Sequence, residues 1–433
     1  MNVADAVADL SLIWKQAAIV FPYFDRQQTD WDSAYSAFLP RIMAGGSETE
    51  LHLLLAEFIN LLGDGHTDYL FPRRLTDEIG YLPFSLNYIK GDYYANVPDG
   101  EGRRPVKVTG LNGMPMQAVL EKAFRYIYHV ENFSAPSRLH AILPFFLHAT
   151  ENELTTSAGV FRFDLAQTKP ALTAWGPLVP ACAAQPVSRG ELDIRLYENG
   201  ILYVKLDNFL YSGAADEVAA ALRSAAPLRG VILDLRENIG GMTVFGARVA
   251  ELLIDGAFHG CQKRTRTMTG VDLASASQMA TMSREAFAKI AGQDDGAAEE
   301  FERCRKLIQG VYFEEYQDTY GAPEHRAMYA GPCVLLTSRN TVSAAEDFVA
   351  MFRSNHRATV IGAPTQGTTG TPLIQSLLCG GRARICSVAY RLLDGTEFIG
   401  SGIAPDIPAE NDVNDYAGGR DAVLELALQQ FDS

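Results

Sequence analysis

The sequence predicts an α/β protein, and three observations support this prediction. From residue 189 onward, short apolar runs typical of buried strands alternate with amphipathic stretches of helical spacing, the pattern of a sheet flanked by helices. Hydrophobic residues make up 47% and charged residues 21% of the 433 residues, so the chain can build a core and is neither disordered nor fibrous. Its length corresponds to about two or three domains.

The first 63 residues are expected to be helical. A first helix ends before Pro22, and a second begins at Ser47, where Glu50 completes the pattern of a capping box, and stops at Gly63. The apolar residues at helical spacing in the first helix are Leu10, Ile13, Trp14, Ala17 and Ala18.

The next part of the chain is expected to be rich in strands. A tight turn over 64–66 leads into a strand at 69–71, and alternating apolar residues between 79 and 120 indicate further strands. A helix follows from about residue 116. Four prolines make 169–188 the expected linker to the C-terminal half.

The C-terminal half carries the α/β alternation. The expected strands are 201–206, 231–235 and 333–337. The expected helices are 214–226, 243–254 and one that begins at Ser343. Residues 276–309 are expected to form a polar, acidic helical insertion. We therefore expect three parts: a helical region over 1–75, a β-rich domain with its linker over 76–188, and an α/β domain over 189–433.

The charge and cysteine content exclude several classes of protein. With 37 basic and 52 acidic residues the net charge is −15, which argues against a nucleic-acid partner because phosphate backbones require a basic face. The six cysteines show no CxxC or finger spacing and are expected to be reduced and mostly buried. No metal-ligand spacing occurs among the histidines, so we expect neither a metal nor another cofactor.

The sequence as it stands shows no targeting signal. Asp5 and Asp9 interrupt the region where a secretory peptide would be basic and then apolar. The longest uncharged runs, 170–188 and 358–381, are broken by Pro, Gly and Thr, so no membrane insertion is expected. These features predict a cytoplasmic protein, or a periplasmic or secreted one if a signal was removed.

Ser343 and Glu346 stand at the start of a predicted helix. Ser-x-x-Glu at this place is the pattern of a capping box, which is purely structural. The same geometry also presents a serine hydroxyl beside unpaired N–H groups, which can hold the oxyanion of an acyl-transfer intermediate. Taken alone, the pattern leaves both interpretations open.

Two other strand-to-loop junctions carry residues of the same chemistry. The segment 234–241 ends in Gly240 and Gly241, whose bare backbone allows a substrate carbonyl to approach, although the segment is also an ordinary turn with Arg236 paired to a carboxylate. His66 lies in a turn, where a lone histidine is usually a surface or capping residue. It becomes a candidate because a neutral serine needs a base to act as a nucleophile.

The three junctions together resemble the tail-specific, or C-terminal processing, serine peptidases, in particular the branch related to the tricorn protease core and interphotoreceptor retinoid-binding protein. The matching stretches are 62–67, 231–241, 335–347, 361–370 and 402–406. The resemblance implies a Clp/crotonase-like α/β catalytic domain with an N-terminal helical region and a small middle domain that is PDZ-like or otherwise β-rich.

The resemblance also implies roles for particular residues. Ser343 matches the nucleophile and His66 the general base of the tricorn-like branch. The backbone N–H of Ala344 matches one oxyanion donor, and Gly240 or Gly241 would supply the other.

A late glutamate orients the histidine in that branch. Glu397 is the nearest candidate for this third catalytic residue, and Asp64 is the alternative. The bacterial and plastid processing peptidases instead use a lysine base about 25 residues after the serine, but that segment here is 366–370 and no lysine follows Lys306. The tricorn-like branch also has a serine before its histidine, where this chain has Gly65.

The leading hypothesis is a serine endopeptidase that acts on peptides or unfolded proteins through an acyl-enzyme on Ser343, with no cofactor. The alternatives are a non-catalytic ligand- or peptide-binding protein on the same scaffold, and a non-proteolytic acyl-transfer enzyme that uses the glycine pair without Ser343. A histidine of ordinary pKa would make activity rise through roughly pH 6–7.5. The oligomeric state does not follow from the sequence.

Overall fold

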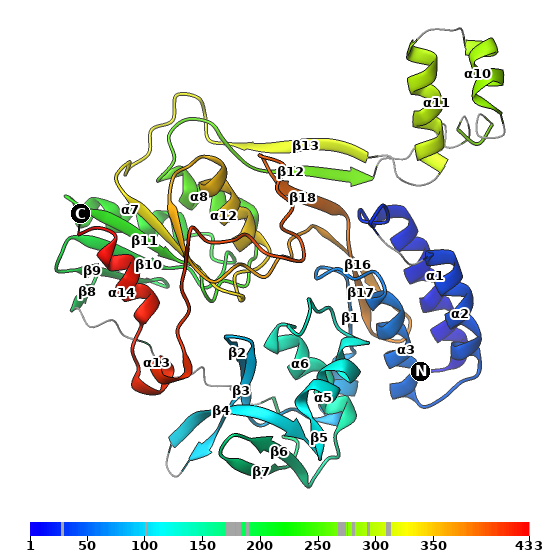
Figure 1. The fold of residues 1–433 in the computed structure, drawn as a ribbon, viewed down its shortest axis with the longest axis horizontal. Helices are drawn as coiled ribbons and strands as arrows, with labels where there is room; N and C mark the ends of the chain where they lie inside the picture. Colours follow the sequence, from blue (N-terminus) through cyan, green and yellow to red (C-terminus); the bar gives the residue numbers. More distant parts are fainter. Residues whose placement is uncertain are drawn as a thin grey trace.

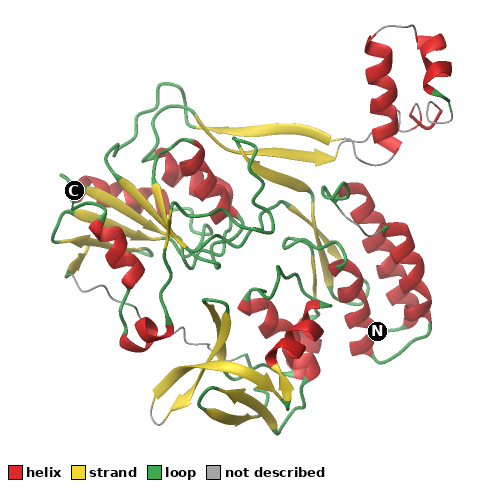
Figure 2. Cartoon of the chain, in the orientation of Figure 1, coloured by secondary structure: helices red, strands yellow, loops and turns green. Residues whose placement is uncertain are grey.

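The chain is described from a computed structural model, and Figures 1 and 2 show its arrangement. The structure describes residues 1–26, 30–99, 102–169, 178, 183–187, 190–266, 274, 276–278, 282–291, 295–308 and 313–432. The expected linker lies mostly outside these residues, as does Cys182, but Pro186 falls within the short strand β8 (Ala184–Pro186). Among the described helices, none combines the length and the apolar composition needed to cross a membrane.

Three helices form the N-terminal region: α1 (Val3–Val20), α2 (Trp31–Met43) and α3 (Glu48–Asn60). The predicted capping box at Ser47 is confirmed, since its hydroxyl accepts from the N–H of Glu50 and the Glu50 carboxylate accepts from the N–H of Ser47. The sequence pattern did not separate α2. Its start is marked by Asp30, whose carboxylate accepts from the N–H groups of residues 32 and 33.

A small antiparallel sheet joins this N-terminal region to a segment near the C-terminus. Its strand order is β1-β17-β16, with β1 over Asp68–Leu70, β17 over Arg382–Cys386 and β16 over Pro372–Ser376. Apolar side chains of the helices and of β17 share one core, which includes Leu10, Phe58, Ala383 and Ile385. Residues separated by about three hundred positions in sequence are therefore fixed against each other.

The middle region is a twisted antiparallel sheet with helices packed against it, seen at the bottom of Figure 1. Its strands are β2 (Ser85–Ile89), β3 (Asp92–Asp99), β4 (Gly102–Leu111), β5 (Met114–Pro115), β6 (Asn152–Thr156) and β7 (Gly159–Phe163). Its helices are α4 (Arg73–Ile79), α5 (Met116–Phe124), α6 (Pro136–Ile142) and a 3-10 turn over Leu143–Phe146. The β-rich character and the helix from residue 116 are confirmed.

The C-terminal part contains a seven-stranded sheet in the order β19-β15-β14-β11-β10-β9-β8. Its remaining strands are β9 (Asp193–Tyr197), β10 (Ile201–Lys205), β11 (Gly230–Asp234), β14 (Cys333–Thr337), β15 (Thr359–Gly362) and β19 (Ile407–Pro408). The strands from β10 to β19 run parallel, whereas β8 and β9 are antiparallel. Both β11 and β14 are buried along their whole length, in keeping with sequences that are apolar except for Asp234 and Thr337 at their ends.

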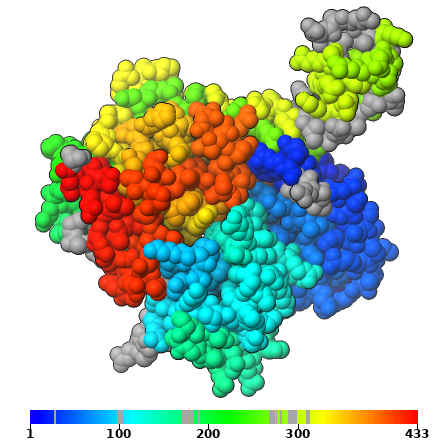
Figure 3. Space-filling model, in the orientation of Figure 1, coloured from blue at the N-terminus to red at the C-terminus, as the bar shows by residue number. Residues whose placement is uncertain are grey.

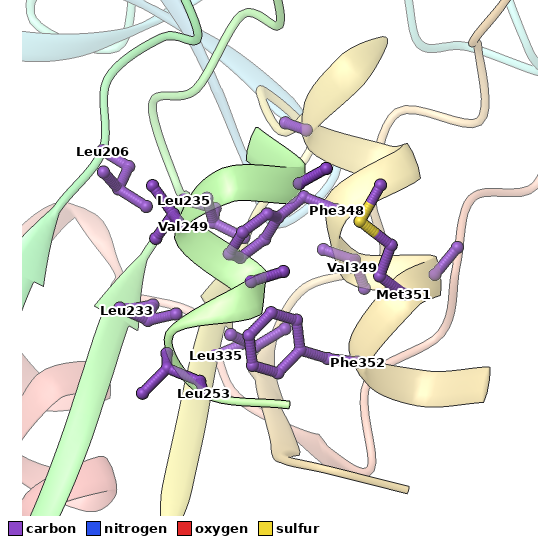
Figure 4. Packing of buried hydrophobic residues seen from close by; sticks show 14 of the residues in the cluster. Leu206, Leu233, Leu235, Val249, Leu253, Leu335, Phe348, Val349, Met351 and Phe352 are labelled. Carbon is purple, nitrogen blue, oxygen red and sulfur yellow. The ribbon is translucent and has the colours of Figure 1, made fainter. Parts of the chain in front are cut away.

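Helices cover both faces of this sheet. Figure 4 shows Phe348, Val349 and Phe352 of α12 (Ala344–Ser354) packed with residues of α8 (Thr243–Glu251) over the sheet. The other helices of this part are α7 (Ala214–Ser224), α13 (Val413–Gly418) and α14 (Ala422–Gln429), of which α14 contributes to a core on the opposite face. The predicted α/β fold with a helical N-terminal region is confirmed.

A second antiparallel sheet carries the insertion. Strand β12 (Phe258–Arg266) pairs with β13 (Phe313–Tyr320) on one side and with β18 (Val388–Leu392) on the other. Helices α10 (Arg284–Ala291) and α11 (Asp295–Ile308) lie between β12 and β13 in sequence. Figure 3 shows these two helices standing out from the body of the molecule.

Candidate active site

The nucleophile candidate and the glycine pair meet because β11 and β14 are neighbouring parallel strands. The loop after β11 carries Gly240, and the loop after β14 carries Ser343. A Cβ on Gly240 would lie 2.6 Å from Cβ of Ser343, and the φ of Gly240 is 89°. Only glycine allows this approach, and its conformation also favours glycine.

Ser343 has a conformation that is rare for a residue with a side chain. Its φ is 63° and its ψ is −131°, and its hydroxyl makes no capping hydrogen bond to α12. The carboxylate of Glu346 does not return to the helix start but accepts hydrogen bonds from the loop 365–368. The capping-box interpretation of this motif is therefore wrong, and the strained serine directs its hydroxyl to another partner.

That partner is His66, which lies 277 residues earlier in the sequence. Its Nε2 lies 3.0 Å from Oγ of Ser343, and its Nδ1 lies 2.7 Å from Oγ1 of Thr368. The pairing of β1 with β17 brings the turn that carries His66 to this position. The structure thus joins Ser343, His66 and the glycine pair in one site.

The environment of His66 favours its neutral form. Burial lowers the pKa of His66 to about 3, and the nearby cations Arg384 and Arg138 act in the same direction. The expectation of an imidazole with an ordinary pKa is thereby corrected. A rise in activity between pH 6 and 7.5 is therefore not expected from the titration of His66.

The structure does not bring the predicted third residue, Glu397, to the imidazole. Its carboxylate forms a 2.6 Å ion pair with Arg26 at the surface. The alternative, Asp64, accepts hydrogen bonds from the backbone N–H of His66 and from the hydroxyl of Thr67, so it holds the turn and does not touch the ring. Burial raises the pKa of Asp64 to about 6.

Sequence reasoning missed Thr368 as the second partner of the ring. The available signal was its place in the segment 366–370, where the processing peptidases carry their lysine base. The side chain of Thr368 also explains Gly65, because a Cβ there would lie 2.3 Å from Oγ1 of Thr368.

The turn that carries His66 is clamped by two arginines. Arg138 of α6 donates to the Asp68 carboxylate at 3.1 Å and to the carbonyl of Gly65, and Arg384 of β17 donates to Asp68 at 2.7 Å. The middle region and the C-terminal region therefore both hold the backbone on either side of His66.

The backbone N–H groups of the two loops that meet at the site differ in whether they have a partner among the described residues. The N–H of Gly240 donates to the side-chain oxygen of Asn238 at 2.9 Å, and the N–H of Ser343 donates to the carbonyl of Thr368 at 3.0 Å. Within the described residues, neither the N–H of Gly241 nor that of Ala344 donates a hydrogen bond to another part of the chain. Gly241 follows Gly240, and Ala344 follows Ser343, and these two preceding residues form the close contact between the loops.

Residues 200–409 match Peptidase family S41. No curated protein matches the sequence.

The fold is shared with solved structures at low sequence identity. The structure of mature CPAF complexed with lactacystin has a TM-score of 0.72 and 14% identity, over 99% of this chain and 99% of that chain. A putative peptidase from Parabacteroides merdae has a TM-score of 0.56 and 16% identity, over 100% of this chain and 98% of that chain. These likenesses show the fold alone.

Proposed function

We propose, from the premise that this chain carries a peptidase family S41 domain, that it is a serine endopeptidase that forms an acyl-enzyme on Ser343 with His66 as general base. The observation that carries the proposal is the 3.0 Å contact between Nε2 of His66 and Oγ of Ser343 at the N-terminus of α12. A nucleophile and a base within hydrogen-bond reach are the minimum needed for acyl transfer by serine.

The proposed reaction has two steps, acylation of Ser343 and hydrolysis of the acyl-enzyme. Oγ of Ser343 attacks the peptide carbonyl while its proton passes to Nε2 of His66, and the same proton then goes to the leaving amine as the C–N bond breaks. A water molecule then attacks the carbonyl of the acyl-enzyme and gives one proton to Nε2. That proton passes to Oγ of Ser343 as the acyl–oxygen bond breaks, which releases the new carboxyl end and restores the serine hydroxyl and the neutral histidine.

The free N–H groups of Ala344 and Gly241 are proposed as the oxyanion donors. The corresponding group of Gly240 is occupied by Asn238, which favours Gly241 as the glycine that contributes. Donors held in place before the reaction stabilise the negative charge that develops on the carbonyl oxygen.

Exposed apolar side chains surround these donors and support a peptide or unfolded protein as the substrate. Ile239 is 66% exposed and Met242 54% exposed on either side of the glycine pair, and Leu210 follows Phe209, whose backbone pairs with that of Gly241. Exposed apolar side chains that gather at one place are typical of an interaction surface.

A fluorophosphonate probe tests the proposal directly. We expect the native protein to be labelled on a single peptide that contains Ser343, because such probes report a serine activated by a base. Absence of labelling in folded protein would favour the non-catalytic binding alternative. Acyl-transfer activity without labelling would favour the alternative of a non-proteolytic acyl-transfer enzyme that uses the glycine pair without Ser343.

Activity is expected to survive a strong chelator. The described residues contain no group of three or more His, Cys, Asp or Glu placed to hold a metal ion, and the proposed steps use only the serine, the histidine and backbone donors. Peptide hydrolysis should be measured after incubation with EDTA and dialysis. A loss that zinc or another metal ion restores would contradict the proposed mechanism.

Replacement of Arg138 by alanine is expected to lower kcat about tenfold, because a small displacement of a catalytic group is costly and Arg138 holds the backbone next to His66. Peptide hydrolysis and thermal unfolding should be measured together. The matched control is Arg162→Ala, which removes an arginine that is 82% exposed in the middle region. Folded Arg138→Ala protein with the native kcat would show that the clamp does not act on the base.

A further inference from the structure

We infer that Thr368, held in place by Glu346, is the positioning residue that orients His66 for proton transfer, in the role expected of a carboxylate. The inference rests on the proposed function, and it assigns the group behind the base. The geometry points to it because the ring nitrogens of His66 have Ser343 and Thr368 as their partners, while Glu397 is engaged with Arg26.

Thr368 connects the two reacting side chains through separate atoms. Its Oγ1 lies 2.7 Å from Nδ1 of His66, and its carbonyl accepts the N–H of Ser343 at 3.0 Å. Its own N–H donates to Oε2 of Glu346 at 2.7 Å. The residue is fully buried, so no water competes for these contacts.

The direction of the hydrogen bond follows from the chemistry. For Nε2 to accept the proton of Ser343, the hydrogen of the neutral imidazole must sit on Nδ1. In this tautomer Nδ1–H donates to Oγ1 of Thr368, and the contact holds the plane of the ring. A hydroxyl oxygen carries no net charge, so it stabilises the imidazolium less than a carboxylate would.

Space around the hydroxyl is reserved for this contact. A Cβ on Gly65 would lie 2.3 Å from Oγ1 and 2.6 Å from Cβ of Thr368, so a side chain at position 65 would displace the threonine. Position 65 is a glycine because the Thr368 hydroxyl, which contacts His66, occupies the space that a side chain at position 65 would need.

Glu346 fixes the loop that carries Thr368. Its two carboxylate oxygens accept from the hydroxyl of Thr365 and from the N–H groups of Gly367 and Thr368. A carboxylate that accepts three such bonds holds the loop firmly only while it is ionised, since a proton on one oxygen removes an acceptor.

Glu346 also links the site to pH. Burial raises the pKa of Glu346 to about 7, while the three hydrogen bonds act in the opposite direction. The titratable groups near it are Asp347 on α12, Cys261 on β12 and Tyr128 after α5; Asp347 also raises its pKa, and burial raises the pKa of the other two so that they stay neutral. As the pH falls through about 7, Glu346 gains a proton and activity should fall.

The first experiment compares Thr368→Val with Thr368→Ser. Valine keeps the shape of the threonine side chain and removes its hydroxyl, so we expect kcat to fall about a hundredfold with little change in KM. This loss is smaller than the one expected when the base itself is removed. Serine keeps the hydroxyl and should restore kcat to within about threefold of the native value. The matched control is Thr369→Val, since the hydroxyl of Thr369 contacts Asp347 and not His66.

The second experiment follows the pH dependence of Glu346→Gln. The glutamine keeps one acceptor oxygen but places its NH2 group, which cannot accept, against the N–H of Thr368. At pH 8 the kcat of the variant should therefore equal the lower kcat that the native protein shows below pH 7. The decline of kcat through about pH 7 should then be absent in the variant.

The outcomes separate this inference from the proposed function. If Ser343→Ala and His66→Ala abolish activity while folded Thr368→Val keeps the native kcat, the positioning role is wrong and the proposed function stands. If the Ser343 and His66 variants remain active, the proposed function itself is wrong. Should Thr368→Val not fold, Thr368→Ala and Glu346→Gln provide the same comparison, and native kcat at pH 8 in both would overturn the inference.

Discussion

Ser343→Ala is expected to abolish fluorophosphonate labelling and to lower peptide hydrolysis by about a millionfold, while the fold and its thermal unfolding stay unchanged. The substitution removes a hydroxyl that makes no capping bond to α12 and whose partner is His66, so the helix loses no support. The loss should fall on kcat, because without the nucleophile no acyl-enzyme forms.

The measurement should use purified protein with a casein or peptide substrate. Ser401→Ala is the matched control, since it removes a serine hydroxyl from a neighbouring loop that lacks contact with the base. Native turnover by Ser343→Ala protein would remove Ser343 from the mechanism altogether.

His66→Ala is expected to lower turnover by about a thousandfold or more and to slow fluorophosphonate labelling in parallel. Without Nε2 the hydroxyl of Ser343 loses the proton acceptor that the described residues place within hydrogen-bond distance, and the segment 366–370 offers no lysine in its place. Residual activity above the uncatalysed rate would come from the backbone donors and from substrate binding.

The pH dependence distinguishes the base from its surroundings. His66 itself stays neutral above about pH 4, because burial lowers its pKa to about 3.

The matched control for His66→Ala is His356→Ala, since His356 is an exposed histidine that follows the end of α12. Full activity of His66→Ala would mean that another group accepts the serine proton.

The sequence predicted the architecture well where periodicity carries the information. The mainly apolar runs at 231–235 and 333–337 identified β11 and β14, and the Ser47–Glu50 pair located the start of α3. These features depend on neighbours along the chain, so a single sequence suffices to read them. The motifs at 240–241 and 343 likewise follow strands that proved to be adjacent.

Apart from the Ser343–His66 pair, which the resemblance supplied, contacts between distant segments could not be predicted from the sequence. Glu397 stood in a suitable motif, but its partner is Arg26, and nothing in the sequence reveals that pairing. The role of Thr368 was hidden for the same reason, since its importance follows from where β1 pairs with β17. Ser-x-x-Glu at 343–346 left the capping box and the nucleophile both open, because the pattern alone does not reveal that the Glu346 carboxylate accepts from a loop and not from its own helix start.

The pairing of β1 with β17 has a consequence for the life of the molecule during synthesis. His66 meets residues that follow it by 277 and 302 positions, and the strand that holds its turn pairs with residues up to Arg384. Under the proposed function, a nascent chain that ends before Ser343 would carry the base without the nucleophile. The pair would come together only after the residues of β17 have been made, so a shorter chain would have no assembled site with which to cleave itself or neighbouring chains.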